Sequence, residues 1–130
     1  MTRTIGLMLV AVMMIAVAPA LAGGKATQMW RCELDDDATE DQVVEAAEKW
    51  LAAAKTMKGG ANFEAYVYFP VAVNNNGESD LIFMVVAPNF KEWGEFWDGY
   101  DGSPAAKVDK ANEEFAVCPD SAVWESIKVE

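Results

Sequence analysis

The chain has 130 residues, of which 52% are hydrophobic, and its 21 acidic and 10 basic residues give a formal net charge of −11, with no histidine. This length suits one domain, and the acidic balance argues against nucleic acids and anionic lipid surfaces as partners, because both repel negative charge. Without histidine, the chain lacks Ser-His-Asp and Cys-His nucleophilic sites, haem held by a proximal histidine, and ordinary zinc sites.

Residues 1–22 have the layout of a secretory signal peptide. Arg3 supplies the positive end, an apolar run follows over 5–17, and small residues precede a cleavage position after Ala22. We expect residues 23–130 to be released from the membrane into the periplasm or the medium as one domain, with a formal charge of −12 after the loss of Arg3. The alternative is an uncleaved anchor helix, which the short apolar run disfavours.

The first elements of the exported part are a strand and a helix. Apolar and polar side chains alternate over 27–34 (TQMWRCEL), which predicts a strand. Thr39 and Gln42 match a capping box, so a helix is expected to begin at Thr39 and to end at Gly59 and Gly60. Its apolar stripe consists of Val43, Ala47, Trp50, Ala54 and Met57.

The middle of the chain predicts a hairpin. An extended segment covers 63–73 (FEAYVYFPVAV), Asn76-Gly77 forms the turn, and an apolar strand covers 81–87 (LIFMVVA). Both faces of these strands are apolar, although a sheet covered by helices on one side should have a polar second face.

A broken helix and a last strand complete the chain. Asn89 caps the first helical piece, the segment from Gly99 to Gly102 interrupts it, and Ser103 caps a second piece that runs to about residue 115. Alternation returns over 121–130 and predicts the last strand.

The order strand, helix, strand, strand, helix, strand predicts an α+β domain with ferredoxin-like β-α-β-β-α-β topology and a four-stranded antiparallel sheet. The last strand then lies beside the first, which brings Cys32 close to Cys118. An even cysteine count in an oxidising compartment favours a disulfide between them. The alternative is two buried free thiols, and a redox role is disfavoured because the chain has no C-x-x-C.

The apolar second face of the sheet predicts a cover. Its extent exceeds the exposed apolar area that a soluble monomer usually tolerates, and a second copy of the chain is the commonest solution. We therefore expect a homodimer in which the open sheet faces pack together. The alternative is a monomer that covers this face with its own tail.

Over residues 27–130 the chain resembles the dimeric α/β-barrel superfamily, in its element order and its two-sided apolar strands. The segments FPVA (69–72), EWGEFWDGY (92–100) and VCPDSAVWES (117–126) are similar to those of small exported bacterial proteins of unassigned activity. The resemblance implies ferredoxin-like subunits packed sheet to sheet, each with a cavity between its sheet and its helices. The superfamily includes haem-degrading and quinone-forming monooxygenases and chlorite-decomposing haem enzymes. Its haem enzymes generally use histidine, so we expect no cofactor here.

An aromatic stripe runs along the broken helix at helical spacing: Phe90, Trp93, Trp97 and Tyr100. Phe96 lies at its edge. The stripe either packs on the sheet as core, or lets Trp93 and Trp97 line a ligand pocket between helix and sheet; the sequence leaves both open. Gly94 would allow the close approach of a strand or a ligand, at a cost of about 1 kcal/mol relative to alanine.

Polar residues near the hairpin are the other candidates for this pocket. Glu64 interrupts an apolar strand, and desolvation would raise its pKa if it pointed into the cavity. Asn62, Tyr66 and Tyr68 are further groups that could orient a ligand. The acidic segments 35–37 and 98–103 do not match a calcium-binding loop, so we expect solvated turns and no metal.

Three functions are consistent with these observations. The first is an exported, non-catalytic homodimer that binds a small apolar or aromatic molecule between helices and sheet. The second is a cofactor-free monooxygenase or isomerase that uses Trp93, Tyr66 or Asn62 to orient an aromatic substrate. The third is an interaction partner of another envelope protein. The lack of a catalytic constellation favours the first.

Overall fold

The computed structural model describes residues 23–72 and 80–130, and the expected signal peptide and Asn76-Gly77 turn lie outside the described residues. Within these ranges the chain forms four strands and three helices. In chain order they are β1 (Lys25–Leu34), α1 (Glu40–Lys55), β2 (Glu64–Tyr68), β3 (Leu81–Ala87), α2 (Phe90–Asp98), α3 (Pro104–Asn112) and β4 (Ala116–Ser126).

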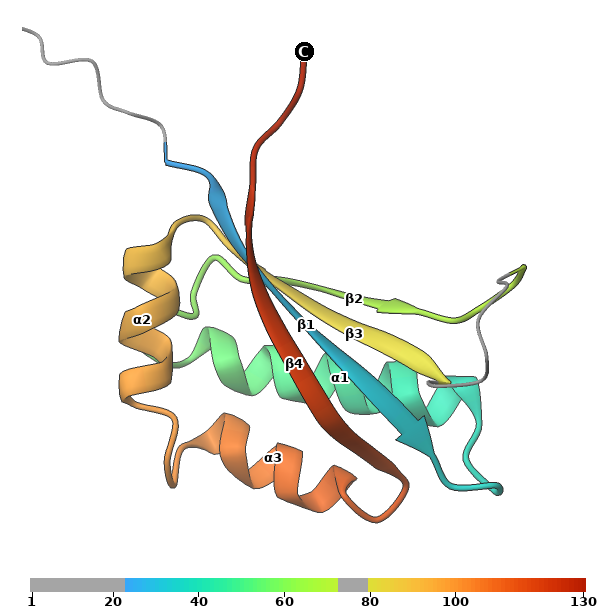
Figure 1. Cartoon of the computed structure of the whole chain (residues 1–130). Helices are drawn as coiled ribbons and strands as arrows, with labels where there is room; N and C mark the ends of the chain where they lie inside the picture. Colours follow the sequence, from blue (N-terminus) through green and yellow to red (C-terminus); the bar gives the residue numbers. More distant parts are fainter. Residues whose placement is uncertain (1–22, 73–79) are drawn as a thin grey trace, which may run out of the picture.

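The strands form one antiparallel sheet in the order β2-β3-β1-β4. All three helices lie on one side of this sheet, and its other face is open (Figure 1). The predicted ferredoxin-like topology is therefore confirmed, including the break of the second helix into α2 and α3. No helix in the described ranges is both long and apolar enough to cross a membrane.

Helix α1 begins as predicted but ends earlier. The Thr39 hydroxyl accepts a hydrogen bond from the Gln42 N–H, and the Gln42 side chain accepts one from the Thr39 N–H at 2.9 Å. The helix ends at Lys55 rather than at Gly59, because Thr56 serves as its C-cap and donates its hydroxyl proton to the Ala53 carbonyl. Its buried side chains are Val43, Ala46, Trp50 and Ala54.

The glycines after α1 bring α2 close to it. Gly59 has φ +82°, and a Cβ on Gly60 would lie 2.1 Å from the Ala54 carbonyl oxygen and 3.1 Å from the Phe96 ring. Phe96 is fully buried, with its ring centroid 4.8 Å from that of Phe63. It therefore lies at the centre of the core and not at the edge of a stripe. The packing of α2 on the sheet and on the glycine loop after α1, rather than helical periodicity alone, decides which side of α2 is buried.

Gly94 does not provide the close approach expected from the sequence. A Cβ at this position would meet no atom within 4 Å. Neither a strand nor a helix lies against it, so the absence of a side chain there has no packing reason.

Strand β2 is shorter than the extended segment expected over 63–73. It ends at Tyr68, which pairs with Ile82, and the next position along would pair with Leu81, the first residue of β3. Residues 69–72 do not continue the strand. Pro70 also has no backbone N–H to donate to a ladder.

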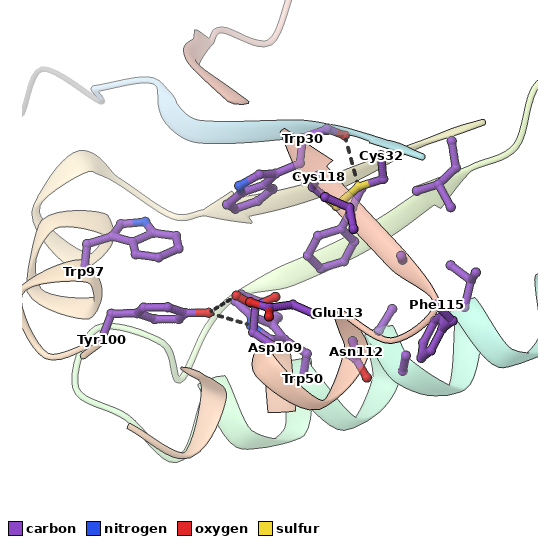
Figure 2. Close-up of a pocket in the computed structure, with 17 residues that line it drawn as sticks. Trp30, Cys32, Trp50, Trp97, Tyr100, Asp109, Asn112, Glu113, Phe115 and Cys118 are labelled. Carbon is purple, nitrogen blue, oxygen red and sulfur yellow. Dashed lines mark hydrogen bonds between the residues drawn. A yellow bond between two sulfur atoms is a disulfide. The ribbon is translucent and has the colours of Figure 1, made fainter. Parts of the chain in front are cut away.

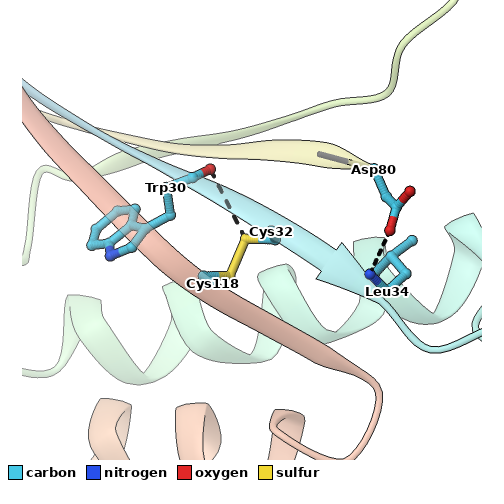
Figure 3. The surroundings of a disulfide bond; sticks show 5 residues. All are labelled: Trp30, Cys32, Leu34, Asp80 and Cys118. Carbon is cyan, nitrogen blue, oxygen red and sulfur yellow. Dashed lines mark hydrogen bonds between the residues drawn. A yellow bond between two sulfur atoms is a disulfide. The ribbon is translucent and has the colours of Figure 1, made fainter. Parts of the chain in front are cut away.

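Strand β4 covers 116–126 instead of the expected 121–130, so Cys118 lies inside it rather than before it. Pro119 is tolerated because β4 is an edge strand. The register with β1 shifts between Arg31 and Glu33, where β4 contains an extra residue. This irregularity puts Cys118 opposite Cys32, and the predicted disulfide joins them (Figure 3).

Candidate functional site

A cavity of about 530 Å³ lies between the sheet and the helices. Figure 2 shows β1 above it, α1 and α3 below it, and the end of α2 on one side. Aromatic side chains form much of its wall: Trp30, Trp50, Phe83, Trp97, Tyr100 and Phe115.

Each element brings its side chains to the cavity through its own periodicity. Alternation along β1 puts Trp30 and Cys32 on the helix side of the sheet, and helical spacing puts Asp109, Asn112 and Glu113 on one face at the end of α3. Helix α3 makes its main contacts with α1 rather than with the sheet. Space therefore remains between α3 and β4, with the disulfide in its wall.

The aromatic rings of the wall support one another. Trp30 stacks on Phe83 with ring centroids 5.6 Å apart, and its ring lies 6.0 Å from that of Trp97. Trp97 and Tyr100 lie 4.5 Å apart. These spacings are typical of favourable aromatic pairs, so the wall is preformed.

A chain of hydrogen bonds links α1, the segment after α2, and α3 at the lower side of the cavity. The Trp50 indole N–H donates to the Tyr100 hydroxyl at 3.5 Å, and this hydroxyl donates to Asp109 Oδ2 at 3.0 Å. Burial raises the pKa of Tyr100 to about 12, and the Asp109 carboxylate contributes in the same direction. Tyr100 is therefore a neutral hydrogen-bond donor at ordinary pH, and it orients Asp109.

The charged side chains that line the cavity are both acidic. They are Asp109 on α3, which accepts the hydrogen bond from the Tyr100 hydroxyl (Figure 2), and Glu113, the C-cap residue of α3. None of the described ion pairs involves either of them. The cavity therefore has a negative rim beside an aromatic wall.

One buried donor beside the cavity lacks an acceptor. Among the described residues, the indole nitrogen of Trp97 is the buried side-chain polar atom without a hydrogen-bond partner. Trp93, on the same helix, donates its indole N–H to the Gln28 side chain at 3.0 Å. An unpaired buried donor costs about 1–3 kcal/mol, and an acceptor on a bound ligand or water would remove this cost.

The aromatic stripe divides between the cavity and the core. Trp97 and Tyr100 line the cavity. Trp93 is half-buried and packs against the core at its bond to Gln28, and Phe90 is 44% exposed at the start of α2. Of the six ligand-binding residues predicted from the sequence, Trp97 is the one that lies in the cavity wall.

The candidates near the hairpin lie elsewhere. Glu64, Tyr66 and Tyr68 are exposed and occupy alternate positions of β2, facing away from the helices. Asn62 is exposed and donates to Glu92 at 3.5 Å. The Tyr66 hydroxyl donates to Glu64 at 2.7 Å and, with nearby Lys25, holds the pKa of Glu64 below its usual value. This direction is opposite to the one expected for a carboxylate inside the cavity.

Sequence reasoning missed most of the cavity wall. The sequence pattern puts Trp30 in an alternating strand and Trp50 in the apolar stripe of a helix, and nothing in it distinguishes Asp109 or Glu113 from the other acidic residues. The available signal was the spacing of these two acids by one helical turn. This spacing indicates a candidate site only once the fold shows that this side of α3 faces the cavity.

In the described part of the chain, no three His, Cys, Asp or Glu side chains gather into a group that could hold a metal ion. The two carboxylates of the cavity rim can instead accept hydrogen bonds or pair with a cation.

No family model matches the sequence, and no curated protein does. Solved structures match by fold. One of an Arabidopsis thaliana protein is 8% identical over 82% of this chain and 96% of its own, with a TM-score of 0.54. HapK from Hahella chejuensis is 11% identical over 81% and 95%, with a TM-score of 0.52. A dimeric ferredoxin-like protein of unknown function from Bacteroides fragilis is 14% identical over 79% and 97%, with a TM-score of 0.45. The first two agree with the ferredoxin-like fold.

Proposed function

We propose that this chain is an exported, non-catalytic protein that binds a small, largely apolar molecule in the cavity between its helices and its sheet. The observation that carries the proposal is the cavity itself. Its volume of about 530 Å³ lies within the range of small-molecule sites, and six aromatic side chains line it.

The polar groups of the cavity support binding rather than turnover. They come from Tyr100, Asp109, Asn112 and Glu113, and both cysteines in the wall are joined in the disulfide. Tyr100 is a poor base because its neutral form is the stable one up to a pKa of about 12. Such groups can orient a ligand, and no serine, threonine, lysine or free cysteine among the described residues lines the cavity as a nucleophile.

Export agrees with two features. The disulfide between Cys32 and Cys118 is typical of an oxidising compartment, and residues 1–22 read as a signal peptide. The proposed location is the periplasm or the extracellular medium.

The open face of the sheet supports a homodimer. A row of apolar side chains crosses all four strands, because Tyr66, Met84, Met29 and Ala122 are neighbours in the ladder. Tyr68 and Trp124 add area on the same face and are 48% and 58% exposed. Charged groups lie on both sides of this row. Lys25 forms an ion pair with Glu64 on one side, and Arg31 and Asp120 are ladder partners on the other. A second copy would cover the face with matching apolar and charged groups.

The test is a fluorescence titration of the disulfide-bonded protein with N-phenyl-1-naphthylamine, a neutral apolar probe. Ala47 lines the cavity and Ala52 is an exposed position on the same helix, so Ala47→Phe and Ala52→Phe form a matched pair. We expect Ala47→Phe to lower the affinity about tenfold or more by filling the site, and Ala52→Phe to leave it unchanged. Equal affinity in both variants, or no binding to the parent protein, would refute the proposal.

A further inference from the structure

We infer that the ligand is an organic cation, a protonated amine or quaternary ammonium group attached to an apolar body. This inference rests on the proposed ligand binding and adds the charge of the ligand. It follows from which charged groups the cavity wall contains, where they stand, and what surrounds them.

The first argument is the sign of the rim. Asp109 and Glu113 are the charged residues of the wall, and no lysine or arginine among the described residues lines the cavity. The two carboxylates are one helical turn apart on α3, a spacing at which like charges repel. A ligand cation between them would relieve this repulsion, whereas a ligand carboxylate or phosphate would add to it.

The second argument is the direction of α3. This helix begins at Pro104 and ends at Asn112, and Asn112 and Glu113 line the cavity at its C-terminal end. The C-terminal end of a helix carries partial negative charge. Glu113, the C-cap residue, therefore adds a carboxylate where the backbone already disfavours one. A ligand cation beside Glu113 would be attracted both by this carboxylate and by the helix end.

Lys110 in the last turn of α3 offsets part of this charge from outside the cavity wall. Lys107 and Lys110 are exposed and do not line the cavity. All four charged side chains at the end of α3, these two lysines with Asp109 and Glu113, are exposed, but the cavity wall includes the two carboxylates and neither lysine.

The third argument is the aromatic wall. Trp30, Trp97 and Tyr100 lie within 6.0 Å of a neighbouring ring and form one surface that reaches the carboxylates. Faces of tryptophan and tyrosine attract cations, and aromatic walls with an acidic partner are a recurring solution for ammonium groups. The same rings would contact the apolar part of the ligand. The cavity therefore offers an apolar surface together with carboxylates, which suits an amphipathic amine.

A matched set of three probes tests the inference by isothermal titration calorimetry: tryptamine, tryptophol and indole-3-acetate. They share an indole body and carry a cation, no charge and an anion. We expect tryptamine to bind about tenfold or more tightly than tryptophol, because its ammonium meets two carboxylates, and indole-3-acetate to bind weakest. Added salt should weaken tryptamine binding and leave tryptophol binding unchanged.

Two variants test whether a carboxylate of the cavity rim causes the preference for the cationic probe. Glu113→Gln should lower the affinity for tryptamine more than the affinity for tryptophol, whereas Glu114→Gln, an exposed neighbour outside the wall, should leave the preference intact. Equal binding of the three probes, a preference for the anion, or no binding of tryptamine would overturn the inference. The neutral probe with the Ala47→Phe variant reports separately whether the cavity binds ligands, so the two failures are distinguishable.

Discussion

Trp93 and Trp97 lie one turn apart on α2, and they differ in what their indole nitrogens contact. Trp93 donates to Gln28, whose side chain is itself buried, so that bond satisfies two polar groups at once. Trp97 has no acceptor for its buried N–H. The indole N–H of Trp93 is thus hydrogen-bonded, whereas the buried N–H of Trp97 has no partner. Of the two residues, Trp97 is the one that lines the cavity.

This difference predicts the stability of two variants. Trp93→Phe removes ring area and leaves the Gln28 oxygen without its donor, so it should lower the free energy of unfolding by about 2–3 kcal/mol. Trp97→Phe loses similar ring area but also removes an unpaired donor, and we expect a cost smaller by about 1–2 kcal/mol. Urea denaturation followed by far-ultraviolet circular dichroism measures both. An equal or larger loss for Trp97→Phe would mean that its N–H finds a partner in solution.

At the scale of elements, most of the chain follows from local pattern. The capping box at Thr39, the cap at Asn89 and the break before Ser103 depend on neighbours in sequence and are found as predicted. The errors lie where the outcome depends on distant partners. Strand β2 stops because β3 begins at Leu81, and β4 starts early because β1 provides a partner as far as Leu34.

The cavity is even harder to predict from local sequence patterns than the ends of the strands. Its wall comes from six elements, β1, α1, β3, α2, α3 and β4, and the space exists because α3 rests on α1. The aromatic stripe predicted that Trp97 could face a pocket. No local pattern indicated that Trp30 or Glu113 would lie opposite it.

A second prediction about stability concerns Gly94 in α2. A Cβ there would meet no atom, so Gly94→Ala should raise the free energy of unfolding by about 1 kcal/mol through helix propensity. Gly60→Ala is the matched control, because its Cβ would lie 2.1 Å from the Ala54 carbonyl oxygen, and it should destabilise the protein. Thermal unfolding compares the two. A loss of stability for Gly94→Ala would indicate a neighbour that packs on this side of α2 in the assembled protein.

At the scale of the whole molecule, the proposed dimer and the proposed ligand site use opposite sides of the sheet. The cavity lies on the helix side with β1 and β4 as its roof, and the apolar row of Tyr66, Met84 and Met29 lies on the open side. Both strands of the roof therefore contribute to the face that a second copy would cover. Dimerisation would hold this roof in place without closing the cavity.

This arrangement predicts that assembly and binding can be separated. Tyr68→Glu would put an unpaired charge into the dimer interface, at a cost of about 3 kcal/mol and roughly a hundredfold in the dimer dissociation constant. Val44→Glu is the control, because Val44 is 41% exposed on α1 and Tyr68 is 48% exposed on the open face. Analytical ultracentrifugation should find a dimer for the parent protein and for Val44→Glu, and a monomer for Tyr68→Glu at the same concentration. The monomer should still bind the neutral probe, because the cavity residues remain in place. A monomeric parent protein would contradict the dimer, and loss of binding on dissociation would mean that the cavity depends on the second copy.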